Sequence, residues 1–542
     1  MSALKKIILK NYGGLSVFVQ DRQSMKQGHP EKQFVLAGRY PAFSLPIDWT
    51  KNNSLTFPMD GNDRYGDCLY AAACHADNTF TGNLGPESNF DLQSIINSYL
   101  QLSPSNSGLN SGQIIGAWKN GLANIPSAQI LDALDLDPTN AAAMQAAIYL
   151  FGGVVFMLAL PDVWHNSYGP GVIWNAPATP DPSLGHAVWW NGVDANGNYK
   201  LQTWGTYCWI TTSGVKICDP SCFVVFSTRW FNSGGIAPNN LTYLQLAVLW
   251  QQFGGNTLPF RGKTVLPDTT LQKPSLTSFN GVLYIGYKGE TNKNIYVTPS
   301  GNGQTFGNWS QLFETTTDAP ALSSHSDGNL YVAFKAEMSR NVVVSRLIVS
   351  ANGSVQSSGR AFLPDTTVAG PSLASYNGKL YVAYKGETNN NIYITSGDGQ
   401  NFGGATQLSE TTTQSPSLCV HTDANGSYLY LAFKAEMSND LIVVKLNVGG
   451  NGSIQIASRK VIGETSTSSP TIASFNNNLY IAYKGETNNC VYLNSSNDGQ
   501  NFINRFRSSE TTTQAPALAV YNGSLFVGFK SETNTHLIVV NI

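Results

Sequence analysis

The second half of the chain alternates large apolar residues with small or polar ones, in short runs that recur at a nearly fixed distance. The run 380–395 reads LYVAYKGETNNNIYIT, and the lysines that mark its copies lie 46 to 50 residues apart: Lys288, Lys335, Lys385, Lys434, Lys484 and Lys530. A period of this length is typical of propellers and solenoids. Odd copies contain YKGETN, whereas even copies contain FKAEMS or FKSETN. The true repeat is therefore a pair of copies used three times.

Each copy reads as four short strands. An Asn-Gly turn follows the first strand, a polar turn follows the second, and a Gly-rich turn such as 396–402 precedes a polar last strand. Four antiparallel strands at this period form one propeller blade. The sixth copy stops after three strands, but residues 262–272 match the last strand of another copy, 359–369. We therefore expect an all-β, six-bladed ring over 262–542 with an interlocked closure, in which the first strand completes the last blade and covers its edge.

The first half has a different pattern. Helical periodicity comes first, and most strand-like runs follow, which is an α+β layout. The expected helices are 69–78, 92–102, 113–122, 140–151 and 241–253, and the expected strands are 154–160, 186–193, 199–203, 208–212 and 223–227. Residues 161–184, rich in Pro, Gly and Trp, are expected to form a long loop. We therefore expect a multidomain chain with an N-terminal arm 1–44, an α+β domain 45–253, a linker 254–261 and the ring 262–542.

Composition excludes some classes of function. The net charge is −2 and charged residues make up 12% of the chain, about half of the usual ~25%, so no nucleic-acid surface is expected. The longest apolar run, 146–160, is too short for a membrane span. The N-terminus lacks a convincing signal peptide, so we expect cytoplasmic synthesis, and release by a non-classical route stays open. No metal site or cofactor is expected.

The seven cysteines do not form a disulfide framework, and their number is odd. Cys218 and Cys222 are close enough in sequence to pair, and a reduced, buried pair is the alternative. Cys74 is expected on the core face of its helix, whereas His75 is expected at the surface.

One set of residues in the first half resembles the papain-like cysteine peptidases. Residues 45–49 read LPIDW, and Cys68 follows at the start of a small-residue helix, with Asn62 six positions before it. His186 stands in a Gly-His-Ala segment on an expected strand, and Gln202 opens a Gln-Thr-Trp-Gly segment on the next strand. The order and spacing are similar to those of the family's nucleophile, base and orienting residue.

This resemblance implies a papain-like fold and thiol hydrolase chemistry on a peptide substrate. Cys68 would be the nucleophile, at a helix N-terminus whose dipole favours the thiolate. His186 would pair with the thiolate and protonate the leaving group, Gln202 would hold the imidazole, and Asn62 would donate to the oxyanion. An inactive scaffold that keeps the fold is the alternative.

The ring is similar to the carbohydrate-binding propellers of fungal and bacterial lectins. Its Gly-rich turns look like shortened forms of the Asp-box of sialidase-type propellers, which is structural in that family. Carboxylates two residues after the lysines could accept hydrogen bonds from sugar hydroxyls, and the candidate pairs are Lys288 with Glu290, Lys385 with Glu387, and Lys484 with Glu486. The alternative is that these pairs only satisfy each other or a neighbouring blade. If they are sites, three of one kind are more natural than six.

Three functions therefore compete. The first is a glycan-binding protein with a papain-like thiol hydrolase domain, a defence or toxin-type effector that binds cell-surface glycans or glycoproteins. The second is a multivalent lectin with an inactive scaffold. The third is a propeller that binds a protein partner.

Overall fold

The computed structural model describes residues 8–12, 15–19, 22–37, 40–351, 353–423, 426–450 and 452–542. The chain divides into two compact units, Met1–Asn256 and Thr257–Ile542, called here the first unit and the ring. The predicted arm 1–44 lies partly outside the described residues, as does most of the N-terminal segment considered as a signal peptide.

The first unit combines helices with one large sheet and one small hairpin. Its helices are α1 (Arg22–Met25), α2 (Cys68–Gly82), α3 (Leu92–Leu102), α4 (Ser111–Trp118), α5 (Ala141–Phe151), α6 (Asp162–His165), α7 (Thr212–Ile217), the 3-10 helix η1 (Thr228–Trp230) and α8 (Tyr243–Gln252). Its strands are β1 (Ile8–Tyr12), β2 (Leu15–Val19), β3 (Ile47–Asp48), β4 (Ile130–Leu136), β5 (Val154–Pro161), β6 (Ile173–Trp174), β7 (Pro180–Val193), β8 (Tyr199–Thr203), β9 (Thr206–Ile210) and β10 (Ser221–Ser227).

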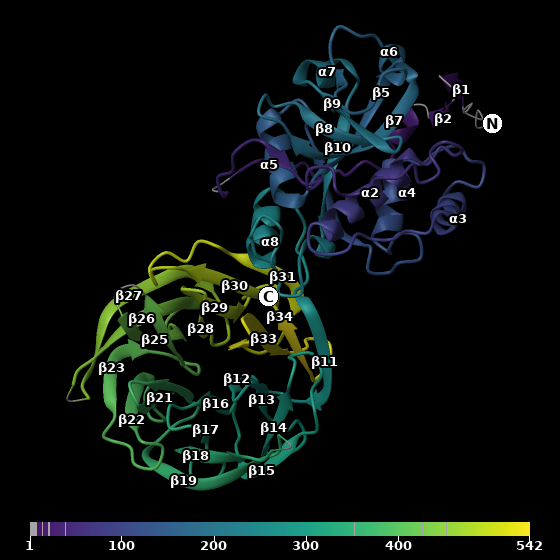
Figure 1. Ribbon diagram of the computed structural model, residues 1–542. Coiled ribbons are helices and arrows are strands. Elements are labelled where there is room, and N and C mark those ends of the chain that lie inside the picture. Colours follow the sequence, from purple (N-terminus) through teal and green to yellow (C-terminus); the bar gives the residue numbers. More distant parts are fainter. Residues whose placement is uncertain are drawn as a thin grey trace. The chain divides into compact units, whose positions relative to one another are not determined.

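The large sheet places β7 at its centre. Its strand order is β4-β10-β5-β7-β8-β9-β6, and β3 also pairs with β7. Every residue of β5 is buried, as its continuous apolar run predicts. Helix α2 packs against β7 (Figure 1) and is buried along nearly its whole length, because alanines allow close approach on all sides. The sheet therefore brings the start of α2 to the middle of β7.

One sequence expectation for this unit needs correction, and one open alternative is decided. The predicted loop 161–184 contains α6, β6 and the first residues of β7. All seven cysteines are buried and reduced, so Cys218 and Cys222 do not form a disulfide. Their thiols instead donate to backbone carbonyls, Cys218 to Val215 at 3.2 Å and Cys222 to Leu136 at 3.1 Å.

The ring consists of six four-stranded antiparallel sheets, as predicted. Blades 1 to 3 are β12 (Ser275–Phe279), β13 (Val282–Lys288), β14 (Asn294–Ser300), β15 (Ser310–Thr315); β16 (Ala321–Ser324), β17 (Leu330–Lys335), β18 (Asn341–Val349), β19 (Val355–Thr366); β20 (Ser372–Tyr376), β21 (Lys379–Lys385), β22 (Asn391–Gly397), β23 (Thr406–Thr411). Blades 4 to 6 are β24 (Ser417–Asp423), β25 (Gly426–Lys434), β26 (Asp440–Val448), β27 (Ile454–Thr465); β28 (Thr471–Phe475), β29 (Asn478–Lys484), β30 (Cys490–Ser496), β31 (Phe506–Thr511); β32 (Ala517–Tyr521), β33 (Ser524–Lys530), β34 (His536–Asn541), β11 (Arg261–Thr269).

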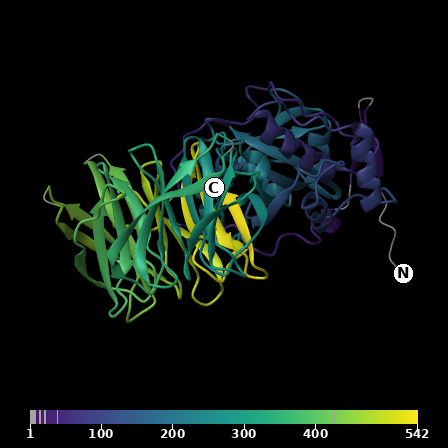
Figure 2. The ribbon, with the colours of Figure 1, turned by 90° about the horizontal axis from the view of Figure 1, so that it is seen from below.

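The structure confirms the interlocked closure. The last sheet has the order β11-β34-β33-β32, so the first strand of the ring pairs with the last strand of the chain. The first strands of neighbouring blades contact one another all round the ring, and β32 contacts β12 (Figures 1 and 2). Asn-Gly turns join the first two strands in several blades, with positive φ at residues such as Asn377 and Gly378, as a type I′ turn requires.

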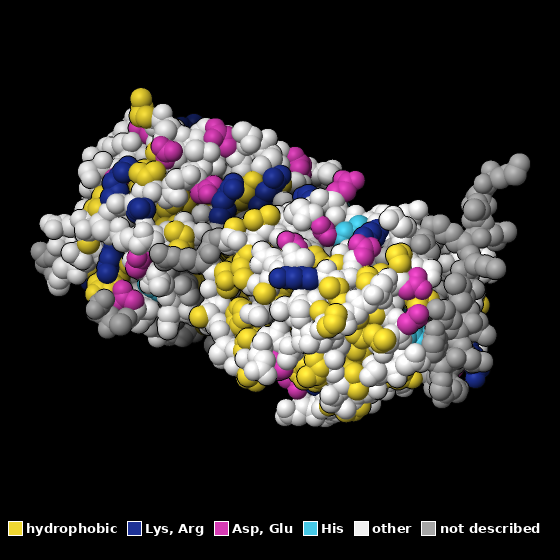
Figure 3. Space-filling model, turned by 90° about the horizontal axis from the view of Figure 1, so that it is seen from above, with side chains coloured by type: hydrophobic (Ala, Val, Ile, Leu, Met, Phe, Trp, Pro, Cys, Tyr) yellow, Lys and Arg dark blue, Asp and Glu magenta, His cyan; other side chains and the backbone are white. Residues whose placement is uncertain are grey.

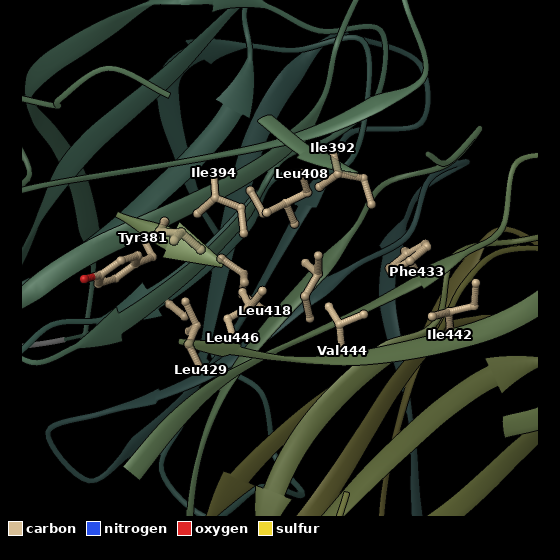
Figure 4. Close-up of a cluster of buried hydrophobic side chains, with 14 residues drawn as sticks. Tyr381, Ile392, Ile394, Leu408, Leu418, Leu429, Phe433, Ile442, Val444 and Leu446 are labelled. Atoms are coloured by element: carbon tan, nitrogen blue, oxygen red, sulfur yellow. The ribbon is translucent and has the colours of Figure 1, made fainter. Parts of the chain in front are cut away.

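Apolar side chains fill the spaces between blades. Figure 4 shows the cluster between blades 3 and 4, where Ile392, Ile394 and Leu408 meet Leu429, Val444 and Leu446. A corresponding cluster joins blade 6 to blade 1 and contains Leu266 of β11. Because each strand alternates its side chains, successive residues serve the clusters on opposite sides of a blade.

Surface charge is sparse and mixed. On the face drawn in Figure 3, basic side chains are interspersed with acidic ones. Within the described ranges, no helix is long and apolar enough to cross a membrane. The same residues contain no cluster of three or more His, Cys, Asp or Glu side chains arranged to hold a metal ion.

Candidate functional site

Cys68 is the first residue of α2 and lies against β7. Its side chain is 2% exposed. The backbone N–H of Ala187, the residue after His186, lies close enough to its sulfur to oppose the rise of the thiol pKa. The fold therefore places the predicted nucleophile beside the strand segment that carries the predicted base.

His186 lies on β7 and is 1% exposed. Its Nε2 is 2.8 Å from Oγ1 of Thr203, at the end of β8. Its ring stacks on Trp204, with 4.5 Å between ring centroids and an interplanar angle of 17°. Its Nδ1 is buried and has no hydrogen-bond partner among the described residues.

Gln202 does not hold the imidazole, in contrast to the expectation from the sequence. Its Nε2 donates to Oδ1 of Asn191 at 2.9 Å. Gln202 is paired across the sheet with Trp189, so the two side chains lie on the same face, opposite to that of His186. Thr203, one residue later, lies on the face of His186. The spacing of the resemblance therefore predicted the correct strand, β8, but a residue on the face opposite to His186.

Asn62 is also turned away from the expected role. Its Nδ2 donates to the carbonyl of Tyr65 at 3.3 Å and to Oδ1 of Asp67 at 3.2 Å. Both amide hydrogens are therefore engaged within the turn that precedes α2. Asp67 is fully buried, and burial raises the pKa of its carboxyl well above the usual range.

The protonation states at this site follow from burial. Burial raises the pKa of the Cys68 thiol to about 12, and the nearby Asp67 acts in the same direction. Burial lowers the pKa of His186 to about 3, assisted by the proximity of His165 and His75. The closed site therefore holds a neutral thiol and a neutral imidazole, whereas the sequence predicted an ion pair.

Other aromatic and imidazole groups lie near Cys68 and His186. His165 is 1% exposed, and its ring makes a T-shaped contact with Trp204, with 5.2 Å between ring centroids. Tyr168 makes a similar contact with Trp204, at 5.0 Å between centroids. Cys74 is buried in the core, as expected. His75 is buried too, contrary to the prediction of a surface position, and its Nε2 is 2.8 Å from the carbonyl of Pro58. The prediction was wrong because α2 is buried on all sides, so that the position of His75 is in the interior as well.

The candidate lysines of the ring donate to nearby backbone carbonyls. Lys288 donates to Gly289 at 3.0 Å, and Lys385 and Lys484 make the equivalent bonds to Gly386 and Gly485 at 3.1 and 3.3 Å. Burial lowers the pKa of all three ammonium groups. Each lysine thus closes the turn that follows its own strand.

The candidate glutamates connect neighbouring blades. Each one bonds to the residue five positions after the lysine of the preceding blade: Glu290 to Thr535, Glu337 to Lys293, Glu387 to Arg340, Glu436 to Asn390, Glu486 to Asn439 and Glu532 to Asn489. The Glu290–Thr535 bond joins blade 1 to blade 6. This closed series favours the structural alternative for the Lys-x-Glu pairs.

A second series of carboxylates occupies the outer strands and faces the next blade. In three clefts the carboxylate pairs with a cation of the next blade: Glu314–Arg360 at 2.7 Å, Glu410–Arg459 at 2.7 Å and Glu510–Lys263 at 2.8 Å. In the other three the partners differ: Asp268 accepts from Tyr287 of the next blade, Glu464 pairs with Arg505 of the next blade at 3.0 Å, and Asp365 acts electrostatically on Tyr384. The sequence analysis missed this series, although the equivalent cation positions Arg360, Arg459 and Lys263 follow the two-copy repeat.

The Gly-rich turns are held by their own side chains. Oδ1 of Asp398 accepts from the backbone N–H groups of Gln400 and Asn401 at 2.8 and 2.7 Å. These bonds lower the pKa of Asp398 to about 2. Asp498 makes the same pair of bonds in blade 5. The carboxylates are thus used within the turns.

No protein-family model and no curated protein matches the chain. Among solved structures, a mutant of Aleuria aurantia lectin in complex with Fucalpha1-6GlcNAc is 9% identical, with 50% of this chain and 92% of that chain covered and a TM-score of 0.34. The PQQ-bound aldose sugar dehydrogenase of Streptomyces coelicolor is 14% identical, with 52% and 98% covered and a TM-score of 0.34. Xylellain, a cysteine protease from Xylella fastidiosa, is 14% identical, with 41% and 99% covered and a TM-score of 0.29. None of these likenesses is close enough to assign a function to this chain.

Proposed function

We propose that the ring binds carbohydrate at several like sites, so that the protein acts as a multivalent lectin on cell-surface glycans. The observation that carries the proposal is the cation–carboxylate pair that recurs at equivalent positions in three alternate clefts. In these pairs the side chains of Arg360, Arg459 and Lys263 are 47%, 46% and 43% exposed. Each pair can accept from and donate to sugar hydroxyls without a further change in the ring.

Each of these cations also has an exposed apolar neighbour two residues along its strand. Phe362 follows Arg360 and is 61% exposed, and Val461 and Val265 hold the equivalent positions at 41% and 54%. Phe313, at 84%, lies beside Glu314 in sequence. An apolar surface next to a charged pair suits a sugar ring, which has hydroxyl groups at its edge and C–H groups on its face. The cleft between blades 1 and 2, with two phenylalanines, is the best developed of the three.

A glycan array probed with the full chain tests this function. We expect binding by the wild type, and loss of it in the triple variant Arg360→Met, Arg459→Met, Lys263→Met. The carboxylate partners are only 5%, 13% and 13% exposed, so a melting curve of the variant must first show that the ring still folds. Lys119→Met, which removes an exposed cation of the first unit, is the control. A wild-type protein that binds no glycan but retains a protein partner would support the interaction-module alternative.

A second activity, thiol hydrolysis in the first unit, is favoured by the arrangement of Cys68, His186 and Thr203. In such a reaction the Cys68 proton passes to His186 as the sulfur attacks a carbonyl carbon. The imidazolium then protonates the leaving amine, and water cleaves the thioester that remains. A peptide reaches this site only after the residues that cover it move, because Cys68 and His186 are almost fully buried. Together, the two activities would suit a defence or toxin-type effector.

Release of a fluorogenic peptide amide by the full chain, compared with the Cys68→Ala variant, tests this second activity. Turnover that is absent from the variant supports it. A wild type without turnover, whose Cys68 also fails to react with thiol-directed electrophiles, supports the inactive-scaffold alternative.

A further inference from the structure

We propose that Thr203 is the residue that positions His186, by accepting a hydrogen bond from Nε2–H and so keeping Nδ1 unprotonated. The inference deepens the thiol hydrolase function proposed above and rests on it. The first observation is the separation of 2.8 Å between Nε2 of His186 and Oγ1 of Thr203, both in the interior. A residue that acts in this way touches neither substrate nor sulfur.

The direction of this bond follows from the other ring nitrogen. If Thr203 donated its proton to Nε2, the neutral imidazole would carry its hydrogen on Nδ1. That N–H would be buried with no acceptor among the described residues, and a buried N–H without a partner is rare and costly. With the hydrogen on Nε2, Thr203 accepts it, and Nδ1 keeps a free lone pair, as a general base requires.

Two further features fix the ring in this state. Trp204 covers one face of the imidazole by stacking, and it limits rotation about the bond to Cβ. Pairing between β7 and β8 places Thr203 on the face of His186 and Gln202 on the other. A threonine hydroxyl therefore fills the role that the resemblance assigned to the Gln202 amide.

The test compares the full chain with Thr203→Val and Thr203→Ser. In protein with ¹⁵N-labelled histidine, we expect the wild type and the serine variant to show the Nε2–H tautomer of His186, and the valine variant to show a mixture. The rate at which iodoacetamide alkylates Cys68 should fall about tenfold or more in the valine variant and recover in the serine variant. Loss of a merely structural contact would not be expected to change the tautomer.

The inference is overturned if the tautomer and the rate are the same in all three proteins, or if Gln202→Met produces the change and Thr203→Val does not. Failure of the proposed hydrolase function would give a different result. A wild-type Cys68 that never reacts contradicts the hydrolase, while the nitrogen spectra still decide the role of Thr203. If the valine variant does not fold, the serine variant with added Gln202→Met separates the two candidates.

Discussion

Burial and the helix N-terminus act in opposite directions on the Cys68 thiol. A rise of its pKa from 9.0 to about 12 corresponds to about 4 kcal/mol. A helix dipole contributes about 0.3–1 kcal/mol, and up to about 2 in favourable geometries. Burial therefore dominates while the site is closed. The sequence could place Cys68 at a helix start, but exposure depends on the residues that cover it.

The residue-scale prediction for this site concerns selectivity. All seven cysteines are buried, and Cys68 is the one at the start of a helix, next to Ala187, which follows His186 on β7. We expect an epoxysuccinate inhibitor to label Cys68 alone, and His186→Ala to slow this labelling strongly because the proton acceptor is lost. Peptide mass spectrometry locates the adduct. Equal labelling of Cys68 and Cys74 would contradict the prediction.

A pH dependence follows from the glutamates that link the blades. Hydrogen bonds from side chains of the preceding blade lower the pKa of Glu290, Glu387 and Glu486 below their ordinary value of 4.5. A carboxyl with a lowered folded-state pKa adds stability above its unfolded-state pKa, and that stability disappears as the pH falls through the folded-state value. We therefore expect the melting temperature of the ring to fall below about pH 4.5.

The triple variant Glu290→Gln, Glu387→Gln, Glu486→Gln provides the comparison for this prediction. It should melt at a lower temperature than the wild type at pH 7. Its melting temperature should also fall less on acidification, because three of the titrating groups are gone. Parallel melting curves for both proteins across pH 3 to 7 would show that the links contribute nothing.

Elements that repeat were predicted well, because each copy serves as a reference for the others. The match of 262–272 to 359–369 identified β11 as the missing strand of the last blade, and the structure confirms it. The segment 161–184 has no copy. Its short helix α6 and two-residue strand β6 depend on tertiary contacts such as the stacking of Trp164 on Trp174 at 5.3 Å, and local propensity does not contain that information.

The element-scale prediction uses two neighbours on β11. Leu266 is 1% exposed and packs between blades 6 and 1, whereas Val265 points outward. We expect Leu266→Ala to destabilise the ring by about 2–5 kcal/mol, as a buried leucine truncation does, and Val265→Ala to change stability by less than about 0.5 kcal/mol. Amide hydrogen exchange of β34, the partner of β11, measures the difference. Equal protection in both variants would mean that β11 does not hold the ring closed.

At the scale of the whole ring, the two-copy repeat acts through the clefts between blades. The sequence showed the alternation in its turns, GETN against AEMS, and directed attention to the Lys-x-Glu pairs there. In the structure those glutamates connect blades in every copy, while the outer strands carry the chemical difference between copies, as in Glu314–Arg360 and Asp268–Tyr287. Pairing of side chains from adjacent blades is not visible in one sequence, because the partners are almost fifty residues apart.

Three like clefts on one ring predict strong avidity. One charged pair and one apolar side chain offer a sugar few contacts, so a free monosaccharide should bind weakly, with a Kd of about 1 mM to 1 μM. A dense glycan surface should hold the full chain about 10²–10⁴ times more tightly, because the second and third contacts are intramolecular.

Arg360→Met, then Arg459→Met, then Lys263→Met should shorten the residence time of the protein on that surface step by step. The affinity of the remaining clefts for free sugar should stay unchanged. Surface plasmon resonance on immobilised glycan, with calorimetry on free sugar, separates the two quantities. Complete loss of surface binding at the first substitution, with the ring still folded, would mean that one cleft binds and the other two do not.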